Sequence, residues 1–173
     1  MATGNMGVTG RLVAWVFVRV PFLANVWARS RQTTGQPAFV FPARPLSGMR
    51  IGVITTGGVH HVDQTPFHRK DENPQGDGSY RLLDLTRPRD AFVLTHDWYD
   101  RRDAERDLNL VLPAVRLREF AEEGIIGELH PVAVGLMGHV KGEEAFRLEH
   151  ETAPEIAAVF REGEVDAVLL VPA

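Results

Sequence analysis

The amino-acid sequence predicts an α/β fold with a doubly wound, mainly parallel sheet, a Rossmann-like three-layer arrangement that is incomplete at its C-terminal end. Short apolar runs alternate with helical patterns along the chain, which is typical of parallel strands and the helices that cover them. Residues 165–171 form an almost continuous apolar run, as expected for a strand with both faces buried. Two of the segments between apolar runs also carry residues that favour helix ends.

The strands are predicted from runs of β-branched and apolar residues. The first is expected at residues 49–55, and it ends in a Thr-Thr-Gly-Gly turn. From this turn to about residue 80, Pro, Asp, Asn and Gly dominate, which indicates a long functional loop or a poorly structured insertion. Further strands are expected at residues 91–95 and 132–136, and residues 108–112 form another short apolar run.

Two helices are predicted with both ends marked. Pro113 stands where a first helical residue tolerates proline, and Gly124 stands where a C-terminal cap is expected. Thr152 and Glu155 form the S/T-x-x-E pattern of a capping box, and Gly163 closes that helix. Because ligands of such sheets bind outside the carboxyl ends of the strands, we expect the site at that edge.

The segment before the first strand is predicted to lie outside the α/β domain. Residues 11–27 contain an apolar run that Arg19 and Pro21 interrupt, so it is too short for a membrane helix and unlike a secretion signal. It predicts a packing or membrane-surface helix. The chain is therefore expected to divide into residues 1–48, an N-terminal amphipathic segment with an extended connection, and residues 49–173, the α/β domain.

Composition excludes several classes of function. With 44% hydrophobic and 24% charged residues, the 173-residue chain is expected to fold as an ordinary globular protein. A net charge of −4 provides no basic surface for nucleic acid. The chain has no cysteine, which excludes disulfides, thiolate metal sites and a cysteine nucleophile within these residues. The absence of cysteine fits a reducing compartment, and we expect a cytoplasmic location.

The Thr-Thr-Gly-Gly turn at residues 55–58 is a candidate anion site, because adjacent glycines let backbone N–H groups converge on an anion. The glycine patterns of dinucleotide-binding folds and of phosphate-binding loops do not occur in the sequence. A tight turn without a ligand explains the same residues.

A second polar cluster, residues 95–100 (Thr-His-Asp-Trp-Tyr-Asp), follows the second predicted strand. His96 and Asp100 share a face if the segment is helical, and a histidine with a carboxylate partner acts as a general base or a metal ligand. No second histidine follows at the i+4 position, so we predict no metal site. An acidic first turn of a helix, which complements the helix dipole, is the structural alternative.

The chain resembles the selenoprotein B family of glycine, sarcosine, betaine and D-proline reductases, in its short form, from about residue 45 to residue 173. The resemblance depends on an ordered series of segments: residues 44–47 (Arg-Pro-Leu-Ser), 53–60 (Val-Ile-Thr-Thr-Gly-Gly-Val-His), 76–81 (Gly-Asp-Gly-Ser-Tyr-Arg), 95–100, 107–113 (Asp-Leu-Asn-Leu-Val-Leu-Pro), 116–127, 137–139 (Met-Gly-His) and 166–172 (Asp-Ala-Val-Leu-Leu-Val-Pro). No single segment is decisive, but their order is specific.

The resemblance implies a reductase subunit that cleaves a C–N bond of a small amino acid or amine with a dithiol/disulfide couple. In this family a selenocysteine, or a cysteine in its place, attacks the α-carbon of the substrate, since a neutral thiol is a poor nucleophile. The implied partners are other reductase subunits, one of which activates the amine through a pyruvoyl group in some members, and a thioredoxin-like dithiol donor. No cofactor is implied in this chain itself.

The sequence departs from the family at the redox residue, which in short members directly follows the strand that ends in Val-Pro. Here Ala173 follows Pro172, and no cysteine occurs anywhere. Two explanations account for the missing redox residue: a UGA codon for selenocysteine that was read as a stop, or a natural or engineered chain without the redox half. In either case we expect little reductase activity from these residues alone.

If the resemblance holds, the site residues follow from their positions at strand ends. The expected catalytic residues, which lie near the reacting centre, are His96, Tyr99 and Asp100. The expected substrate-binding residues, among which the turn supplies backbone donors to a substrate carboxylate, are Thr56, Gly57, Gly58, His60 and Asn109.

Two other functions stay open at this stage. A non-catalytic accessory subunit could hold a small anion with the same turn. A metal-assisted hydrolase could be built around His60, His61 and His96.

Overall fold

The structure is a computed structural model that describes Arg19 and residues 40–173. Residues 42–173 form one compact unit. Apart from Arg19, the predicted N-terminal segment at residues 11–27 lies outside the described residues. In the described part of the chain, no helix has both the length and the apolar character that crossing a bilayer requires.

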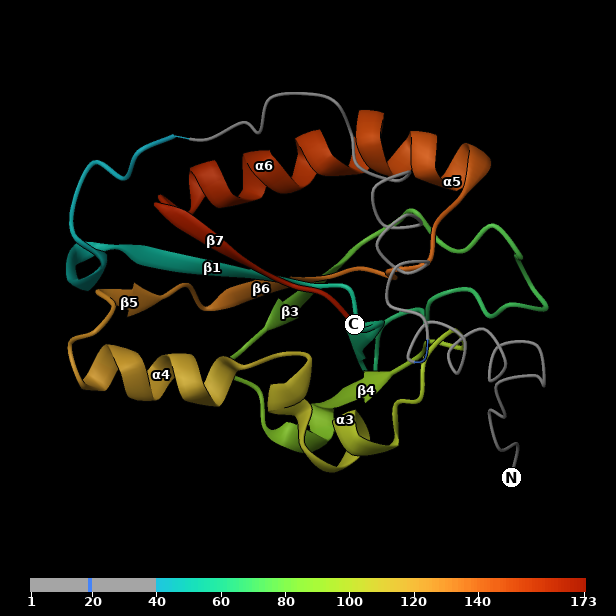
Figure 1. The fold of residues 1–173 in the computed structure, drawn as a ribbon, viewed down its shortest axis with the longest axis horizontal. Helices are drawn as coiled ribbons and strands as arrows, with labels where there is room; N and C mark the ends of the chain where they lie inside the picture. Colours follow the sequence, from blue (N-terminus) through green and yellow to red (C-terminus); the bar gives the residue numbers. More distant parts are fainter. Residues whose placement is uncertain (1–18, 20–39) are drawn as a thin grey trace. The chain divides into compact units, whose positions relative to one another are not determined.

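A mixed five-stranded sheet forms the centre of the unit (Figure 1). Its central strand pairs in parallel with β7 along one side and with β5 and β6 along the other, while β3 pairs antiparallel with β6 at the edge. A separate two-stranded antiparallel sheet joins β2 and β4. The strands are β1 (Arg50–Thr55), β2 (Val59–His61), β3 (Arg81–Asp84), β4 (Phe92–Leu94), β5 (Glu128–Leu129), β6 (Val132–Gly135) and β7 (Ala167–Val171).

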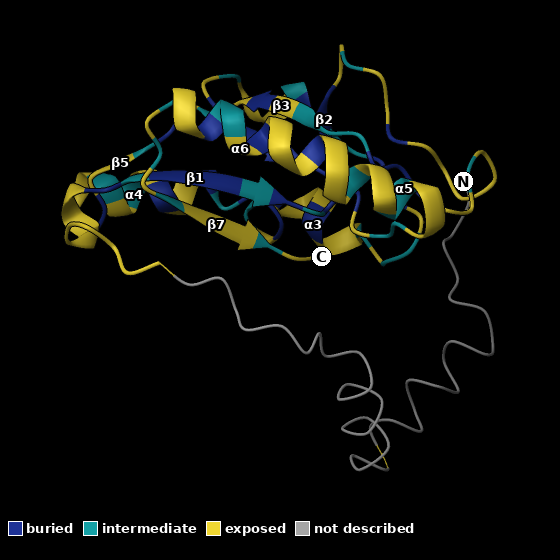
Figure 2. Ribbon diagram, turned by 90° about the horizontal axis from the view of Figure 1, so that it is seen from above, coloured by how far each residue is buried: buried dark blue, intermediate teal, exposed yellow. Residues whose placement is uncertain are grey.

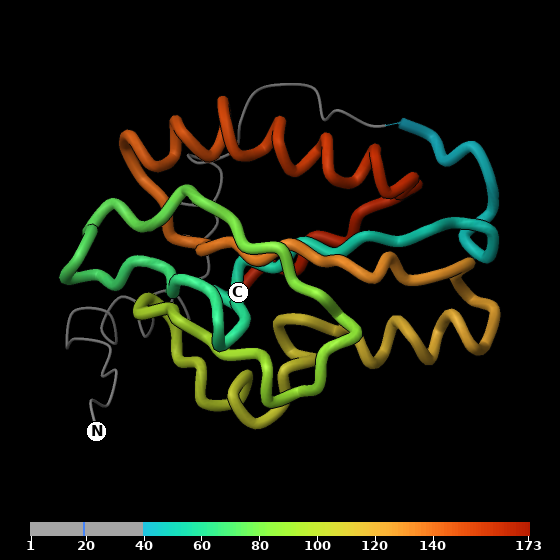
Figure 3. The backbone as a smooth tube through the Cα atoms, turned by 180° about the vertical axis from the view of Figure 1, so that it is seen from behind, coloured from blue at the N-terminus to red at the C-terminus, as the bar shows by residue number. Residues whose placement is uncertain are grey.

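Helices cover both faces of the main sheet, so the unit has three layers. Figure 1 shows α5 and α6 on one face and α3 and α4 on the other, and Figure 3 shows the same arrangement from behind. The helical segments are α3 (Arg102–Arg106), α4 (Ala114–Glu122), α5 (Gly142–Arg147), α6 (Ala153–Glu162), the π-helical turn η4 (Leu148–Thr152) and the 3-10 turns η1 (Leu46–Gly48), η2 (Arg89–Ala91) and η3 (Leu108–Leu110).

Side chains on both faces of β1 contribute to the two cores, and Figure 2 shows that β1 is mostly buried. Ile51 and Val53 are buried in the larger cluster, which includes Leu117 of α4. Ile54 points to the opposite face and packs against a smaller cluster that includes Phe160 of α6. A Cβ atom at Gly52 would lie 2.8 Å from the Phe160 ring, so glycine allows α6 to pack closely on the sheet.

The predicted α/β class is confirmed, but the predicted doubly wound, mainly parallel sheet is not, because the sheet is mixed. β1 and β6 lie where strands were predicted. The predicted strand at residues 91–95 is β4, which pairs with β2 in the second sheet, and residues 108–112 begin with the 3-10 turn η3. Apolar runs identify a strand, but they do not encode its partner or its direction.

The predicted capping box at Thr152 is wrong, whereas α4 begins one residue after the predicted first helical residue Pro113. The hydroxyl of Thr152 donates a 2.6 Å hydrogen bond to the carbonyl of Gly78, and the residue itself lies within η4, which joins α5 to α6. A distant backbone carbonyl thus competes successfully for this side chain. Pro113 is the N-cap of α4, and Gly124 after its end has a φ of 72°.

The expectation that the last strand is buried on both faces is also wrong. Val168, Leu169 and Leu170 are 38%, 40% and 67% exposed. Among the described residues β7 pairs only with β1, so its outer side has no neighbouring strand. The described residues therefore cover the apolar side chains of β7 only in part.

Candidate functional site

The carboxyl ends of three parallel strands converge on Thr56, directly after β1. Its N–H donates to the carbonyl of Val171 at the end of β7, at 3.0 Å. Its carbonyl accepts from the N–H of Gly138, which follows β6, at 2.9 Å, and its hydroxyl accepts from the N–H of Ala173 at 3.0 Å. This is the edge at which ligands of parallel sheets bind.

The backbone donors of the Thr-Thr-Gly-Gly turn all have acceptors within the chain. The N–H of Thr56 is bonded to β7, that of Gly57 donates to Oγ1 of Thr55 at 3.1 Å, and that of Gly58 donates to the carbonyl of Leu136 at 3.0 Å. The carboxylate-binding role of these amides stays a prediction, and it requires a ligand to replace one of these bonds.

The segment after β4 packs against this turn. The N–H of Thr95 donates to the carbonyl of Gly58 at 2.9 Å, and the Tyr99 hydroxyl donates to the carbonyl of Gly57 at 3.1 Å. The rings of His96 and Tyr99 meet edge to face, with centroids 4.6 Å apart. The structure therefore brings together five of the predicted site residues: Thr56, Gly57, Gly58, His96 and Tyr99.

His96 is a buried, neutral histidine, with 3% of its surface exposed. Burial lowers its pKa to about 4, with further lowering by the charges of His139 and Arg101 and an opposing effect of Asp97. Its Nδ1 accepts a 3.2 Å hydrogen bond from the N–H of Trp98, whereas Nε2 is buried without a partner among the described residues. An unsatisfied buried polar atom costs about 1–3 kcal/mol, so its presence needs an explanation.

Tyr99 is fixed in its protonated form. Burial raises the pKa of its phenol to about 12, with a smaller lowering by Arg101. Because the hydroxyl donates to the carbonyl of Gly57, the phenol joins the two loops and orients the turn.

Trp98 and His139 form a stacked pair that the sequence analysis did not assign to the site. Their ring centroids lie 4.4 Å apart with an interplanar angle of 12°. The pKa of His139 is lowered by burial and by the charges of Lys141 and Lys70. Both aromatic residues belong to segments of the family resemblance, but only the fold places the loops after β4 and β6 next to each other.

Asp100 and Asn109, two other predicted site residues, are held by partners elsewhere. Oδ1 of the exposed Asp100 accepts from Nε of Arg102 at 2.8 Å, and this interaction lowers the pKa of the Asp100 carboxyl to about 2. The amide of Asn109 donates to Oδ1 of Asp107 at 3.0 Å within η3, and its Oδ1 accepts from the N–H of Val115 at the start of α4. Both side chains thus have partners within the chain, and the site roles of Asp100 and Asn109 stay predictions.

His60 and His61 are hydrogen bonded through both ring nitrogens. In His60, Nδ1 lies 2.8 Å from the carbonyl of His61 and Nε2 lies 3.0 Å from Oγ1 of Thr95. In His61, Nε2 accepts from the N–H of Asp84 at 2.8 Å and Nδ1 lies 3.3 Å from the carbonyl of Ala91. Within residues 40–173 no group of three or more His, Asp or Glu side chains is placed to hold a metal ion.

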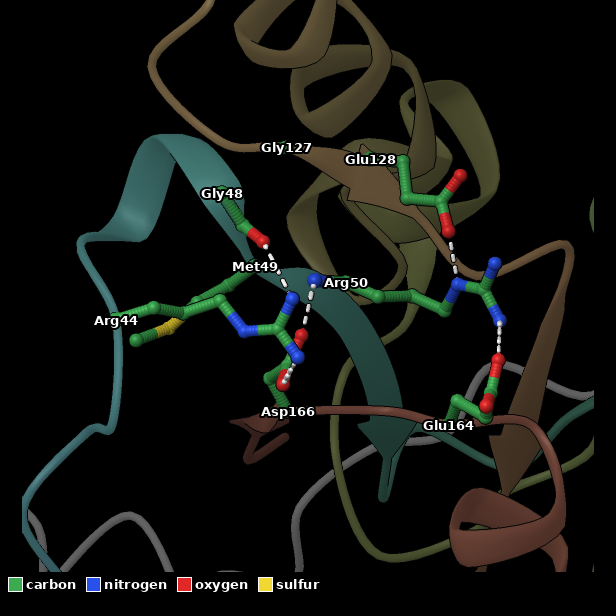
Figure 4. Close-up of a pocket in the computed structure, with 8 residues that line it drawn as sticks. All are labelled: Arg44, Gly48, Met49, Arg50, Gly127, Glu128, Glu164 and Asp166. Atoms are coloured by element: carbon green, nitrogen blue, oxygen red, sulfur yellow. Dashed lines mark hydrogen bonds and ion pairs between the residues drawn. The ribbon is translucent and has the colours of Figure 1, made fainter.

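A polar hollow of about 480 Å³ lies at the opposite end of β1 (Figure 4). Arg50 forms an ion pair with Glu128 there, and its backbone N–H donates to Oδ2 of Asp166 at 2.8 Å. Arg44 lies 2.8 Å from the other oxygen of Asp166. Because these charges pair with each other across the starts of β1, β5 and β7, we assign the cluster to the stability of the sheet.

The fold and the residues around Thr56 define an α/β protein with neutral, buried polar side chains at the carboxyl ends of parallel strands. The sequence profile of the family described as glycine/sarcosine/betaine reductase selenoprotein B matches residues 36–173. The chain belongs to this family.

Curated relatives agree with this assignment. The chain is 33% identical to the D-proline reductase subunit gamma of Acetoanaerobium sticklandii over 137 residues, which cover 79% of this chain and 54% of that protein. It is 32% identical to the glycine reductase complex component B subunit gamma of Symbiobacterium thermophilum over 133 residues, and 32% identical to the betaine reductase complex component B subunit beta of Peptoclostridium acidaminophilum over 131 residues. Each of these two matches covers 75% of this chain and 29% of the relative.

The chain therefore spans about half the length of the D-proline reductase subunit and less than a third of the other two relatives. No solved structure matches it.

Proposed function

We propose that this chain forms the substrate-holding part of a reductase subunit that acts on a small amino acid or betaine and takes electrons from a dithiol. The observation that supports this proposal is the convergence of the strand ends on Thr56. The resemblance implies a redox residue that follows Ala173, just beyond the strand that ends at Val171 and Pro172, and the N–H of Ala173 is bonded to the Thr56 hydroxyl. A nucleophile at that position would stand at the edge that carries His96 and Tyr99.

The proposed reaction replaces the C–N bond at the α-carbon with a C–H bond. The amine leaves with the electron pair of the C–N bond, and the two electrons and two protons come from a dithiol that becomes a disulfide. The attacking selenol or thiol must come from outside these 173 residues, because the chain contains no cysteine. Activation of the amine belongs to a partner subunit, as the resemblance implies.

The residues of this chain would bind and orient the substrate. Tyr99 holds the turn through the carbonyl of Gly57, and the Thr56 hydroxyl positions the backbone that follows β7. His96 stays neutral near physiological pH, so it presents a polar group without a competing charge. Preorganised polar groups in a buried site favour a reaction because they need no rearrangement as charge develops.

The purified 173-residue chain is expected to oxidise no dithiol when it is given glycine, sarcosine, betaine or D-proline, because it lacks a thiol or selenol. The reductase complex assembled with its partner subunits is expected to cleave the C–N bond of at least one of these compounds, which releases an amine from glycine, sarcosine or betaine and opens the ring of D-proline. Thiol titration measures dithiol oxidation by the chain alone and by the complex, and assays of the released amine or of the opened ring measure C–N cleavage. Dithiol oxidation by the chain alone would refute the need for an external nucleophile, and an assembled complex inactive on all of them would refute the proposed function.

A non-catalytic anion-binding subunit is the second candidate, and the absence of cysteine favours it. In that case glycine or betaine would raise the melting temperature of the chain. An assembled complex whose amine release does not change when this chain is omitted would then support the accessory function over the reductase function.

A further inference from the structure

The Nε2 atom of His96 is a polar atom whose role is not explained by the fold. It is buried and has no hydrogen-bond partner among Arg19 and residues 40–173, and the rings of Trp98 and Tyr99 meet the His96 ring edge to face. The other buried histidines of the edge differ, since His60 and His61 use both ring nitrogens within the chain.

The hydrogen bond at the other nitrogen determines what this atom can do. Nδ1 of His96 accepts from the N–H of Trp98, so the ring carries a lone pair on Nδ1. In the neutral ring the proton then lies on Nε2. The unpartnered atom is therefore an N–H donor that requires an acceptor.

The surroundings of His96 favour an acceptor with negative charge. The guanidinium of Arg101 donates to the carbonyl of His96 at 3.1 Å, and Lys70 and Lys141 act on the neighbouring His139. The nearby carboxylate, Asp97, already accepts from the N–H of Lys70 at 3.2 Å and lies 3.8 Å from Arg101. Cations around a buried donor stabilise an incoming anion.

We propose that the Nε2–H group of His96 donates a hydrogen bond to the carboxylate of the bound substrate. This inference rests on the proposed function, and glycine, sarcosine, betaine and D-proline all carry that carboxylate. It also accounts for the occupied amides of the Thr-Thr-Gly-Gly turn, because the carboxylate then needs no free backbone donor there.

Because Nε2 of His96 is buried, a carboxylate can reach it only if a neighbouring side chain moves. Tyr99 is fixed by its hydrogen bond to the carbonyl of Gly57. Trp98 is half-buried, and its ring is held by stacking on His139. We therefore expect the Trp98 ring to shift away from His139 when the carboxylate enters.

The experiment is an NMR titration of the 173-residue chain labelled with ¹⁵N-histidine. The Nε2–H signal of His96, identified by its loss in His96→Phe, is expected to move downfield when betaine is added. Choline, which has the same trimethylammonium group but no carboxylate, is expected to leave it in place. An unchanged signal with betaine, or an equal shift with choline, overturns the inference.

Matched variants separate the donor from the shape of the ring. His96→Phe keeps an aromatic ring but removes the donor, and it is expected to weaken betaine binding about 10- to 100-fold. His96→Gln places an amide N–H near the position of Nε2 and is expected to restore most of the affinity. His150→Phe removes an exposed histidine stacked on Phe146 and should bind betaine like the original chain.

The spectra of the variants also show whether each one folds. If the folded His96→Phe chain binds betaine as tightly as the original, the inference fails. In the assembled complex, an unchanged KM for His96→Phe overturns the inference while the proposed function stands, whereas an inactive original complex refutes the proposed function itself.

Discussion

Replacing Gly58 with alanine is expected to lower the free energy of unfolding by about 2–5 kcal/mol, from a left-handed backbone and an overpacked site together. Gly58 has a φ of 69°, and a Cβ atom there would lie 2.3 Å from the carbonyl oxygen of Thr95 and 3.0 Å from Cβ of His96. The backbone cannot relieve this overlap locally, because Gly58 is bonded to both Leu136 and Thr95.

Gly124→Ala is the matched control for this substitution. Gly124 has a nearly equal φ of 72°, but nothing lies within 4 Å of the position of its Cβ atom. Gly124→Ala should therefore lower the free energy of unfolding only by the cost of the left-handed backbone, about 1–2 kcal/mol. Urea denaturation of the two variants measures the difference, and equal losses would show that the contact between the turn and the segment after β4 is not tight.

The stability of the chain is expected to fall by about 3 kcal/mol, through His96 alone, as the pH decreases from 6.5 to 4. Burial lowers the pKa of His96 in the folded chain to about 4 from 6.5. Between these values the unfolded chain binds the proton and the folded chain does not, so acid favours unfolding. The stabilisation is fully present above the unfolded pKa and is lost as the pH falls to the folded pKa.

His96→Phe should remove this part of the pH dependence, because phenylalanine does not titrate. The pKa of His60 is also lowered, mainly by burial, so the variant is expected to keep a weaker dependence of the same sign. Urea denaturation at a series of pH values measures both profiles. Parallel profiles of the variant and the original chain would mean that His96 is protonated as readily in the folded chain as in the unfolded chain.

Much of the candidate site could be predicted from sequence because its residues directly follow apolar runs. The turn after β1 and the segment after β4 were both predicted in this way, and the structure joins them through Tyr99 and Gly57. Asp100 was included through its proximity in sequence to His96, but it turns toward Arg102 instead. Helical spacing could not show this, because the segment before α3 is not helical.

The stacked pair of Trp98 and His139 could not be predicted in the same way. The two residues are far apart in the chain, and no local pattern indicates that their rings meet. His139 belongs to the Met-Gly-His segment of the family resemblance, but that segment by itself assigns it no contact. Its role at this edge follows from the pairing of β6 with β1, which brings the loop after β6 beside the Thr-Thr-Gly-Gly turn.

By itself, the sequence determined the α/β class, the positions of β1, β6 and α4, the family and the absence of a cysteine nucleophile, since these depend on local patterns and on residue identity. The tertiary structure alone decided the antiparallel edge strand β3, the use of the turn amides by neighbouring strands and the unpartnered Nε2 of His96. These features depend on which distant groups meet. Hydrogen-bond satisfaction and burial are properties of the packed chain, and no short stretch of sequence contains them.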